Sequence, residues 1–438
     1  MKRSFYFVCV LTSYLFFSCG WGKNVHTYQN KLYYIGQGES FSSINLKTLQ
    51  AGDTIFFMGG ETFEESIVID SLLCGTSEKP VVITSCGDEP AVIRSGNSGG
   101  IHIYHSKHLK IERIHLIGAG RKDGNTQDGL QLNNCSRIYL SGVETEGYQK
   151  AGLNIYASSD IVAENILAHD NGYCGILVSG EYGRKDASRN ILIRDSKAEN
   201  NPGDPTELSN HSGNGILAGH CTNVTIEYCT ATNNGWDMPR KGNGPVGIWT
   251  YESDSILIQY CIAYRNKTSE EAADGGGFDL DGGVSNAVIQ YCLSYENEGS
   301  GYGLFQYAGA SPWYNNTVRF CISENDGTVS AAQAGVFIWN SSDDPQQLKA
   351  CYFHNNLIYN EKVAAISYER QSLNSGFKFY NNIFVAKDEL ITGEDSAGVF
   401  EDNIWYSFSS NYASVKGKNG KTNITDPHQL KRIFVKNN

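Results

Sequence analysis

Asp279 and Asp281 are the residues of this chain whose type and spacing point most directly to chemistry. They lie two positions apart in the segment Gly277-Phe278-Asp279-Leu280-Asp281, where apolar and acidic residues alternate. Alternate side chains of a strand share one face, so the two Cα atoms should lie about 6.6–7 Å apart on the same side. Two carboxyl groups roughly 5–9 Å apart are what hydrolysis of a glycosidic bond uses, one as acid and one as base or nucleophile. A cation site or a pair of surface acids are the alternatives.

Two further acids flank this pair. Asp274 precedes the same predicted strand, and Glu252 follows the strand of the preceding repeat. Like charges and nearby apolar rings push the pKa values of neighbouring carboxyl groups apart, which would assign acid and base roles. The predicted catalytic residues are therefore Asp279, Asp281, Asp274 and Glu252, and no residue is predicted as a metal ligand of the hydrolytic site.

A repeat of about 30 residues must position these acids. The clearest copies read NVTIEYCTATNN, SILIQYCIAYRN and NAVIQYCLSYEN. Their cysteines, together with Cys321 and Cys351, recur at steps of 32, 31, 29 and 30 residues. A fixed period in this range is typical of solenoids and arrays. The apolar residues alternate with period 2, which favours strands over helical repeats.

Each repeat contains a glycine followed by a short strand whose first side chain is apolar. If that first residue faces inward, the next residue and the one two further on face outward. The outward residues then form one strip, because parallel coils stack about 4.8 Å apart. Around the two aspartates this strip is aromatic: Tyr156, Trp249, Tyr251, Phe305, Tyr307, Phe337 and Trp339. The leading glycines align Asp279 with Trp249 and Phe305, and they align Asp281 with Tyr251 and Tyr307.

An exposed aromatic row of this kind favours carbohydrate binding, since sugar rings stack their C–H faces on flat apolar rings. These seven residues are the predicted substrate-binding residues. The alternative is that a loop packs over the row and buries it. Polar insertions at 184–214, 235–246, 266–276 and 309–316 can serve as walls of a cleft or as such a cover.

Two other recurring residues are interpreted as structural. The cysteines of the repeat should stack as a column of small buried hydrophobes rather than form disulfides. Asparagines follow at the turns and should form a hydrogen-bonded ladder from coil to coil. They are Asn201, Asn234, Asn266, Asn297, Asn325 and Asn356.

Charge and the N-terminal segment narrow the class of protein. The net charge of −12 argues against nucleic acid or an anionic membrane surface as a partner. Residues 1–19 combine Lys2 and Arg3 with an apolar run, which predicts a secretion signal. The ending Ser18-Cys19-Gly20 resembles a bacterial lipoprotein cleavage site, so we expect either a cell-envelope lipoprotein (outer membrane or periplasm) anchored through Cys19 or a secreted protein.

The repeats resemble the pectate-lyase-like superfamily of right-handed parallel β-helix proteins, in particular its bacterial carbohydrate-active members that are secreted or are lipoproteins. GDTIFFMGGETF and GTSEKPVVITSCGDEPAVI resemble the N-terminal capping segment of those proteins. The resemblance implies an all-β fold built as one right-handed parallel β-helix of about ten coils. We expect a cap and first coils at 28–98, the β-helix at 99–400, and a C-terminal cap or tail at 401–438.

The stretch ADGGGFDLDGGVSNAVIQYCLSYENEGSGYGLFQY also resembles a calcium-dependent pectate lyase family of this fold. The resemblance implies that Asp274 takes the place of that family's first calcium-binding aspartate. The following aspartate pair is not matched, because Asn297-Glu298-Gly299 stands there, and no lysine lies on the outward strip. Arg184, Lys185, Arg240 and Lys241 can supply positive charge from loops.

The sequence therefore predicts an exported β-helix enzyme acting on a polysaccharide or oligosaccharide. The first hypothesis is a glycoside hydrolase that uses the paired aspartates and requires no cofactor. The second is a cation-assisted polysaccharide lyase, with Ca²⁺ held around Asp274, Asp279 and Asp281. The third is a non-catalytic glycan-binding solenoid.

Overall fold

The computed structural model describes residues 29–70, 72–269, 272–329, 333–369, 373–394, 397–415, 417 and 420. The predicted secretion signal and Cys19 lie outside these residues, so export and lipid anchoring stay predictions. Within the described part of the chain no helix has the length and apolar character needed to cross a membrane.

The strands form three parallel ladders in which each strand pairs with its counterpart in the next coil. The first ladder, called the site sheet because it carries Asp279, pairs for example β20 with β23 and β23 with β26. Its strands are β4 (Ile67–Ile69), β7 (Ile101–Tyr104), β9 (Leu130–Asn133), β11 (Ala151–Tyr156), β14 (Cys174–Ser179), β17 (Asn214–Gly219), β20 (Val246–Tyr251), β23 (Gly276–Leu280), β26 (Tyr302–Gln306), β29 (Val336–Asn340), β32 (Ile366–Glu369) and β35 (Ile391–Thr392).

The other two ladders are joined because β8 and β10 continue from one into the other. The second ladder contains β1 (Leu32–Ile35), β2 (Thr54–Met58), β5 (Val81–Cys86), β8 (Lys107–Gly118), β10 (Ser136–Glu146), β12 (Ser159–Glu164), β15 (Ser188–Arg194), β18 (Cys221–Glu227), β21 (Asp254–Gln259), β24 (Val288–Gln290), β27 (Trp313–Arg319), β30 (Leu348–His354), β33 (Lys378–Tyr380) and β36 (Val399–Glu401). The third adds β3 (Thr62–Phe63), β6 (Ala91–Gly96), β13 (Leu167–His169), β16 (Lys197–Glu199), β19 (Thr230–Thr232), β22 (Ile262–Tyr264), β25 (Leu293–Tyr295), β28 (Ile322–Glu324), β31 (Leu357–Tyr359), β34 (Ile383–Ala386) and β37 (Ile404–Ser407).

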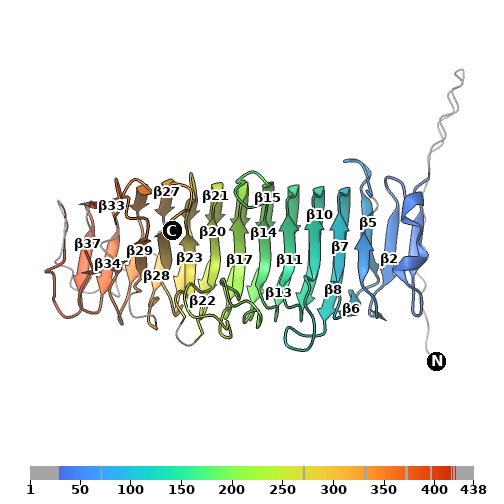
Figure 1. Cartoon of the computed structure of the whole chain (residues 1–438), viewed down its shortest axis with the longest axis horizontal. Helices are drawn as coiled ribbons and strands as arrows, with labels where there is room; N and C mark the ends of the chain where they lie inside the picture. Colours follow the sequence, from blue (N-terminus) through green and yellow to red (C-terminus); the bar gives the residue numbers. More distant parts are fainter. Residues whose placement is uncertain are drawn as a thin grey trace, which may run out of the picture.

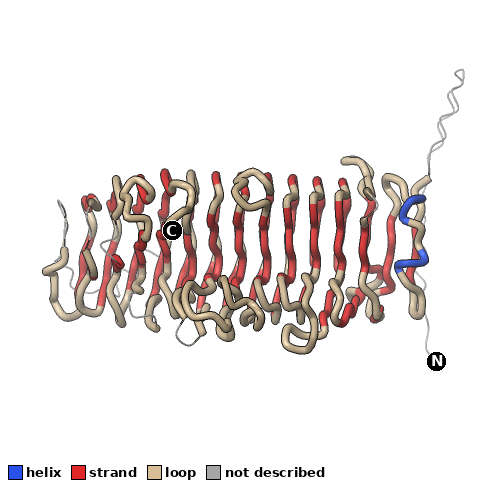
Figure 2. Tube along the Cα trace, in the orientation of Figure 1, coloured by secondary structure: helices blue, strands red, loops and turns tan. Residues whose placement is uncertain are grey.

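The fold is a right-handed parallel β-helix, as the repeat and the resemblance predict. Figure 1 shows the strands stacked along one long axis, with β2 near one end and β37 near the other. Two short 3₁₀ helices, η1 (Phe41–Ser43) and η2 (Leu46–Thr48), lie at the end near β2, and longer loops gather along one edge of the stack (Figure 2). Strands already pair at β1 and β2, within 28–98, and still pair at β37, beyond residue 400.

One continuous apolar core fills the solenoid. It extends along the chain from Ile35 to Trp405 and receives the alternate residues of each strand. In β23 these are Phe278 and Leu280, both fully buried, and the Phe278 ring stacks on Tyr302 of the next coil with centroids 5.4 Å apart. The inward orientation of Phe278 and Leu280, on which the prediction of an outward acidic pair depends, is confirmed.

The cysteine column is confirmed for four of its five predicted members. Cys229, Cys261, Cys292 and Cys321 are buried, unpaired as disulfides, and each precedes a strand of the third ladder. Cys351 instead lies inside β30, opposite Asn316. The position after Cys321 in the column belongs to Asn356, whose Oδ1 accepts the backbone N–H of Cys321 at 2.9 Å. The near-constant step in sequence concealed this change of position.

The asparagine ladder is present with a similar correction. Each side-chain Oδ1 accepts the backbone N–H of the preceding coil's asparagine, at 2.9–3.3 Å. The ladder contains Asn171, Asn201, Asn234, Asn266, Asn297 and Asp326. Asn325 is displaced from it by one residue, and Asn356 begins a second ladder with Asn382 and Asn403.

Candidate functional site

The register of the site sheet places Asp279 directly between Trp249 of β20 and Gly303 of β26. Because Leu280 pairs with Leu304, Phe305 lies two positions further along than the predicted pairing with Asp279 requires. The predicted pairing of Asp279 with Phe305 is therefore wrong by two residues. Gly301-Tyr302, and not Gly303-Leu304, opens this strand, and a slip of two leaves the inward and outward faces unchanged.

The aromatic strip is covered over part of its length. Trp249, Phe305 and Phe337 are only 3–7% exposed. The His211 ring packs edge-on against Trp249 with centroids 4.7 Å apart, and the Trp249 Nε1–H donates to Asn214 Oδ1 at 3.1 Å. Loop residues thus cover the start of the row, and burial lowers the pKa of His211 to about 4, so its imidazole is neutral.

Four of the predicted rings keep partial exposure: Tyr156, Tyr251, Tyr307 and Trp339. Tyr251 and Tyr307 are near the acids, since the Asp281 charge raises the pKa of both phenols, after the larger effect of burial. Tyr307 lies beyond the end of β26 and packs against Gly282, where a Cβ would overlap its ring. The accessible part of the strip is therefore centred on Asp281.

Asp279 and Asp281 differ in exposure. The Asp279 side chain is only 3% exposed, and its Oδ1 is a buried oxygen without a hydrogen-bond partner. Burial, and then the charges of Asp281 and Asp274, raise the pKa of Asp279 well above its usual range. Burial in this position therefore favours the protonated form of Asp279 over the charged form.

Asp281 is the more exposed residue of the pair, since it is only partly buried. Its Oδ1 accepts the backbone N–H of Gly282 at 2.6 Å. Burial, followed by the charges of Asp274 and Glu252, raises the pKa of Asp281 to about 7, although the Gly282 hydrogen bond acts in the opposite direction. This carboxyl group can give or take a proton near neutral pH.

Glu252 and Lys185 meet at the turn that follows Asp281. Glu252 accepts the backbone N–H of Ser311 at 2.8 Å, and a Cβ on Gly283 would overlap its carboxyl group. Gly283 has a φ of 77°, so glycine suits both its backbone and the close approach of Glu252. Lys185 Nζ donates to the carbonyl of Gly283, which brings a cation from a distant loop to the acids.

Asp274 serves mainly as a turn residue. Its Oδ2 accepts the backbone N–H of Gly244 at 2.8 Å, and its Oδ1 accepts from Gln333 Nε2 at 3.4 Å. Burial raises the pKa of Asp274 to about 6. Its charge reaches both members of the pair, since it raises the pKa values of Asp279 and Asp281.

The three aspartates do not fit the calcium site that the lyase resemblance implies. Ca²⁺ takes six or more ionised or carbonyl oxygens. Among the described residues, one group of three His, Cys, Asp or Glu ligand atoms lies within 4.8 Å of one another, and it contains none of Asp274, Asp279 and Asp281.

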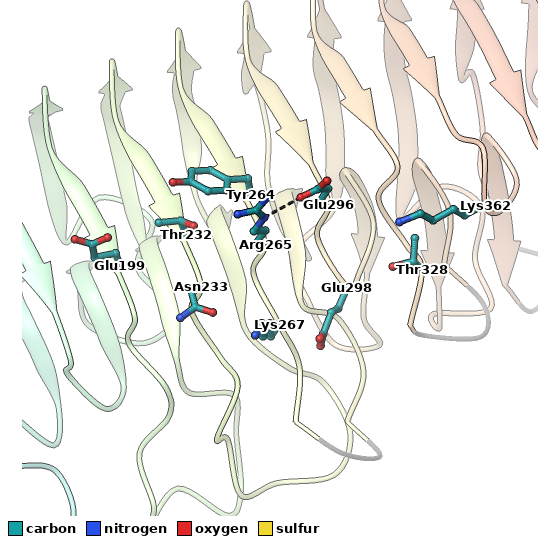
Figure 3. A pocket seen from close by; sticks show the side chains of 10 residues that line it. All are labelled: Glu199, Thr232, Asn233, Tyr264, Arg265, Lys267, Glu296, Glu298, Thr328 and Lys362. Carbon is teal, nitrogen blue, oxygen red and sulfur yellow. Dashed lines mark hydrogen bonds and ion pairs between the residues drawn. The ribbon is translucent and has the colours of Figure 1, made fainter.

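A separate hollow of about 550 Å³ lies along the third ladder. It is lined by Glu199, Thr232, Asn233, Tyr264, Arg265, Lys267, Glu296, Glu298, Thr328 and Lys362. In Figure 3 these side chains form a row across neighbouring coils, and Arg265 is paired with Glu296. Glu298, a neighbour of the acidic site in sequence, lies in this hollow and binds the N–H of Thr268 at 2.8 Å.

The sequence predicts the acids and rings of the site but not the position of Lys185. The loop cation could be named from sequence, whereas its placement at Gly283 depends on a contact between residues 98 positions apart. The cover that His211 forms over Trp249 is equally long-range. The sequence feature that hints at both contacts, of Lys185 with Gly283 and of His211 with Trp249, is the insertion at 184–214. This insertion is long enough to fold back over the strip.

Two solved structures of similar shape are a glycoside hydrolase and an epimerase. GH136 lacto-N-biosidase from Eubacterium ramulus is 14% identical over 86% of this chain and 67% of its own, with a TM-score of 0.54. The A-module of mannuronan C-5 epimerase AlgE4 from Azotobacter vinelandii is 14% identical over 85% of this chain and 91% of its own, with a TM-score of 0.55. At these identities the likeness shows the fold.

No curated protein sequence matches the chain. Residues 38–327, more than half of the chain, match the model of the Pel9A-like right-handed β-helix region. This match covers the ladders from β2 to β28 and includes all four predicted catalytic acids. The chain therefore belongs to the Pel9A-like right-handed β-helix family.

Proposed function

We propose that the protein is a carbohydrate-active enzyme that hydrolyses a glycosidic bond of an oligosaccharide or polysaccharide. The observation that carries this proposal is the partly exposed residue Asp281, whose carboxyl group has a raised pKa and lies beside Tyr251 and Glu252 on an outward strip of a β-helix. The similar solved enzymes named above support carbohydrate as the substrate class.

In this proposal Asp281 is the general acid. With a pKa of about 7 it carries a proton in a large share of molecules at neutral pH, and it is accessible enough to give that proton to a leaving oxygen. Glu252 is the second carboxylate, fixed by Ser311 and Gly283 on the same turn. Asp279 is a positioning residue, because it is enclosed and acts on the substrate through Asp281.

Tyr251, Tyr307 and Trp339 are proposed to bind sugar rings around this centre. Aromatic side chains bury large apolar area against a ligand, and these three keep exposed surface on the same strip. Trp249, Phe305 and Phe337 lie on the same face but are buried, and Trp249 packs against Tyr251 while Phe305 packs against Trp339.

A panel of neutral and acidic glycans, assayed for new reducing ends and for the ultraviolet absorbance of an unsaturated uronate, tests the proposal. Hydrolysis predicts reducing ends without that absorbance. The variant Asp281→Asn should lose activity by about 10²–10⁴-fold. Full activity of Asp281→Asn, or binding of a glycan without cleavage, would contradict the hydrolase.

A polysaccharide lyase is the second candidate, and Lys185 favours it. Burial lowers the pKa of Lys185, although the charges of Glu252 and Asp254 act in the opposite direction, and a lysine with a lowered pKa is suited to proton abstraction. Because the three aspartates do not form a calcium site, this lyase would rely on Lys185 and neighbouring loop cations. An unsaturated uronate among the products selects it over the hydrolase.

A further inference from the structure

A second group of ionisable side chains lies where β10 and β13 end, away from the site sheet. Ligand atoms of Glu146, His169 and Asp170 all lie within 4.8 Å of one another. Glu146 and His169 are register partners on adjacent coils, and Asp170 follows His169 directly. The group therefore joins two consecutive coils through their side chains.

The two ring nitrogens of His169 have different partners: Nδ1 faces this group, and Nε2 faces Glu144. Its Nδ1 is 2.7 Å from Asp170 Oδ2 and 4.0 Å from Glu146 Oε2. Its Nε2 is 3.2 Å from Glu144 Oε1. A carboxylate that accepts the second N–H of a histidine fixes the tautomer and the ring orientation, as in the outer coordination sphere of many metal sites.

Glu146 is oriented in the same way. Its Oε1 lies 3.0 Å from His115 Nε2 on the preceding coil, so its Oε2 is the oxygen turned to His169. His115 and His169 are both about 18% exposed. His169 and Glu146 thus each have a hydrogen-bond partner that orients the side chain. A chance contact between surface acids does not require such partners.

The group is short of positive charge. Within the described parts of the chain, Glu144, Glu146 and Asp170 form ion pairs with His115 and His169 alone. Lys197 of the next coil, opposite Leu167 in the register, pairs with Glu199 at 2.6 Å. Three carboxylates beside two imidazoles give the group a net negative charge when the imidazoles are neutral, and this charge attracts a divalent cation.

We propose that Glu146, His169 and Asp170 bind one divalent transition-metal ion, with water in the remaining positions. One imidazole nitrogen and two carboxylate oxygens suit Zn²⁺ and its first-row neighbours better than Ca²⁺, which takes oxygen ligands. Glu144 and His115 are the positioning residues of this site. The ion would connect β10 to β13 and would stabilise the early coils of the solenoid.

The test is titration of the chelator-treated full chain with Zn²⁺ by calorimetry, and with Co²⁺ followed by its visible absorption. The wild type should bind one ion per chain at this site. Glu146→Gln and Asp170→Asn keep the side-chain volume, and His169→Ala removes the imidazole; each should weaken binding at least about 10–100-fold. His115→Ala should weaken it less.

Two matched controls separate this site from general surface binding. Glu164→Gln removes a carboxylate of the neighbouring β12 that pairs with Arg194, and His354→Ala removes an imidazole whose Nδ1 contacts only Asn355. Both controls should bind like the wild type. A wild type that binds neither ion, or one whose affinity is unchanged in Glu146→Gln, Asp170→Asn and His169→Ala, would overturn the proposal. Since these readouts do not use glycan cleavage, the result is independent of the proposed hydrolase.

Discussion

The ammonium group of Lys185 donates a hydrogen bond to the carbonyl of Gly283, which is 98 residues later in the chain. Lys185 belongs to the loop between β14 and β15, whereas Gly283 closes the turn after β23. The contact therefore crosses several coils and places a cation beside Glu252, whose charge raises the pKa of Lys185 against the lowering by burial. Substitutions of Lys185 separate the two candidate reactions.

Lys185→Met removes the charge and keeps most of the side-chain length. A hydrogen bond made by a charged group contributes about 1.5–3 kcal/mol. In a hydrolase, loss of this tether should lower kcat/KM roughly 10–100-fold, whereas in a lyase it removes the base and should abolish turnover. Lys185→Arg should recover part of the hydrolase activity, because Arg can donate to the same carbonyl. The measurement is kcat/KM of both variants on one glycan, with Arg184→Met as the control.

The activity of a hydrolase that uses Asp281 as its acid should fall as pH rises through about 7, because that carboxyl group then loses its proton. Asp274→Asn removes a charge that raises the pKa of Asp281, so the falling limb should move to lower pH while activity at pH 5 is retained. The pH dependence of kcat/KM for wild type and Asp274→Asn measures this. If the falling limb of Asp274→Asn lies at the same pH as that of the wild type, the limb does not report the ionisation of Asp281.

Asp279 should make the fold pH-dependent. Its pKa is raised in the folded state above the ordinary value of about 3.9, so the folded chain binds more protons than the unfolded chain. Stability from this group is fully present below about pH 4 and is lost as pH rises through its folded pKa. Asp279→Asn removes the ionisation, so the stability of the variant relative to the wild type should increase as pH rises.

Thermal or urea unfolding at pH 4.5 and pH 8 measures this difference. The advantage of Asp279→Asn should be smaller at pH 4.5, where the wild-type carboxyl group is protonated. Val68→Ala, at an exposed position of β4 in the site sheet, removes no titratable or hydrogen-bonding group and is the control that should keep the pH profile of the wild type. Equal pH profiles for wild type and Asp279→Asn would show that Asp279 is not the buried acid responsible.

Buried and exposed rings of the strip should respond differently to truncation. Trp249→Ala removes a buried ring with a hydrogen bond to Asn214 and should cost about 3–5 kcal/mol of stability. Trp339→Ala removes a partly exposed ring and should leave stability nearly unchanged while raising KM. Unfolding midpoints and KM for both variants test the division. If Trp249→Ala raises KM without a loss of stability, Trp249 contacts the substrate, and His211 does not cover its ring.

The repeat predicts the fold because every coil obeys the same alternation of inward and outward side chains. Phe278 and Leu280 follow this rule, and so the outward orientation of Asp279 could be derived from neighbouring residues alone. The same local rule could not show whether an outward residue is accessible, since His211 and Phe305 cover the strip from other coils.

Register was the second limit of the sequence. The coil between Asp281 and Tyr302 is short, and the glycine at 303 imitates the strand-opening glycine at 301. A similar coincidence of spacing placed Cys351 in the cysteine column. Both positions are decided by hydrogen bonds between coils, which a one-dimensional pattern does not contain. Lys185 shows the same limit for loops.

The asparagine ladder also bears on how the chain is made. The backbone N–H of Asn234 is satisfied by the side chain of Asn266, which belongs to the coil that follows it in the sequence. During synthesis the N-terminal coils leave the ribosome first. The backbone N–H of each ladder asparagine therefore has no acceptor until the next coil has also emerged. Ordered growth from the N-terminus would then complete one rung with every new coil. The ladder ends at Asp326, which accepts from Asn297 but lacks the side-chain amide that Asn234, Asn266 and Asn297 donate to the next coil.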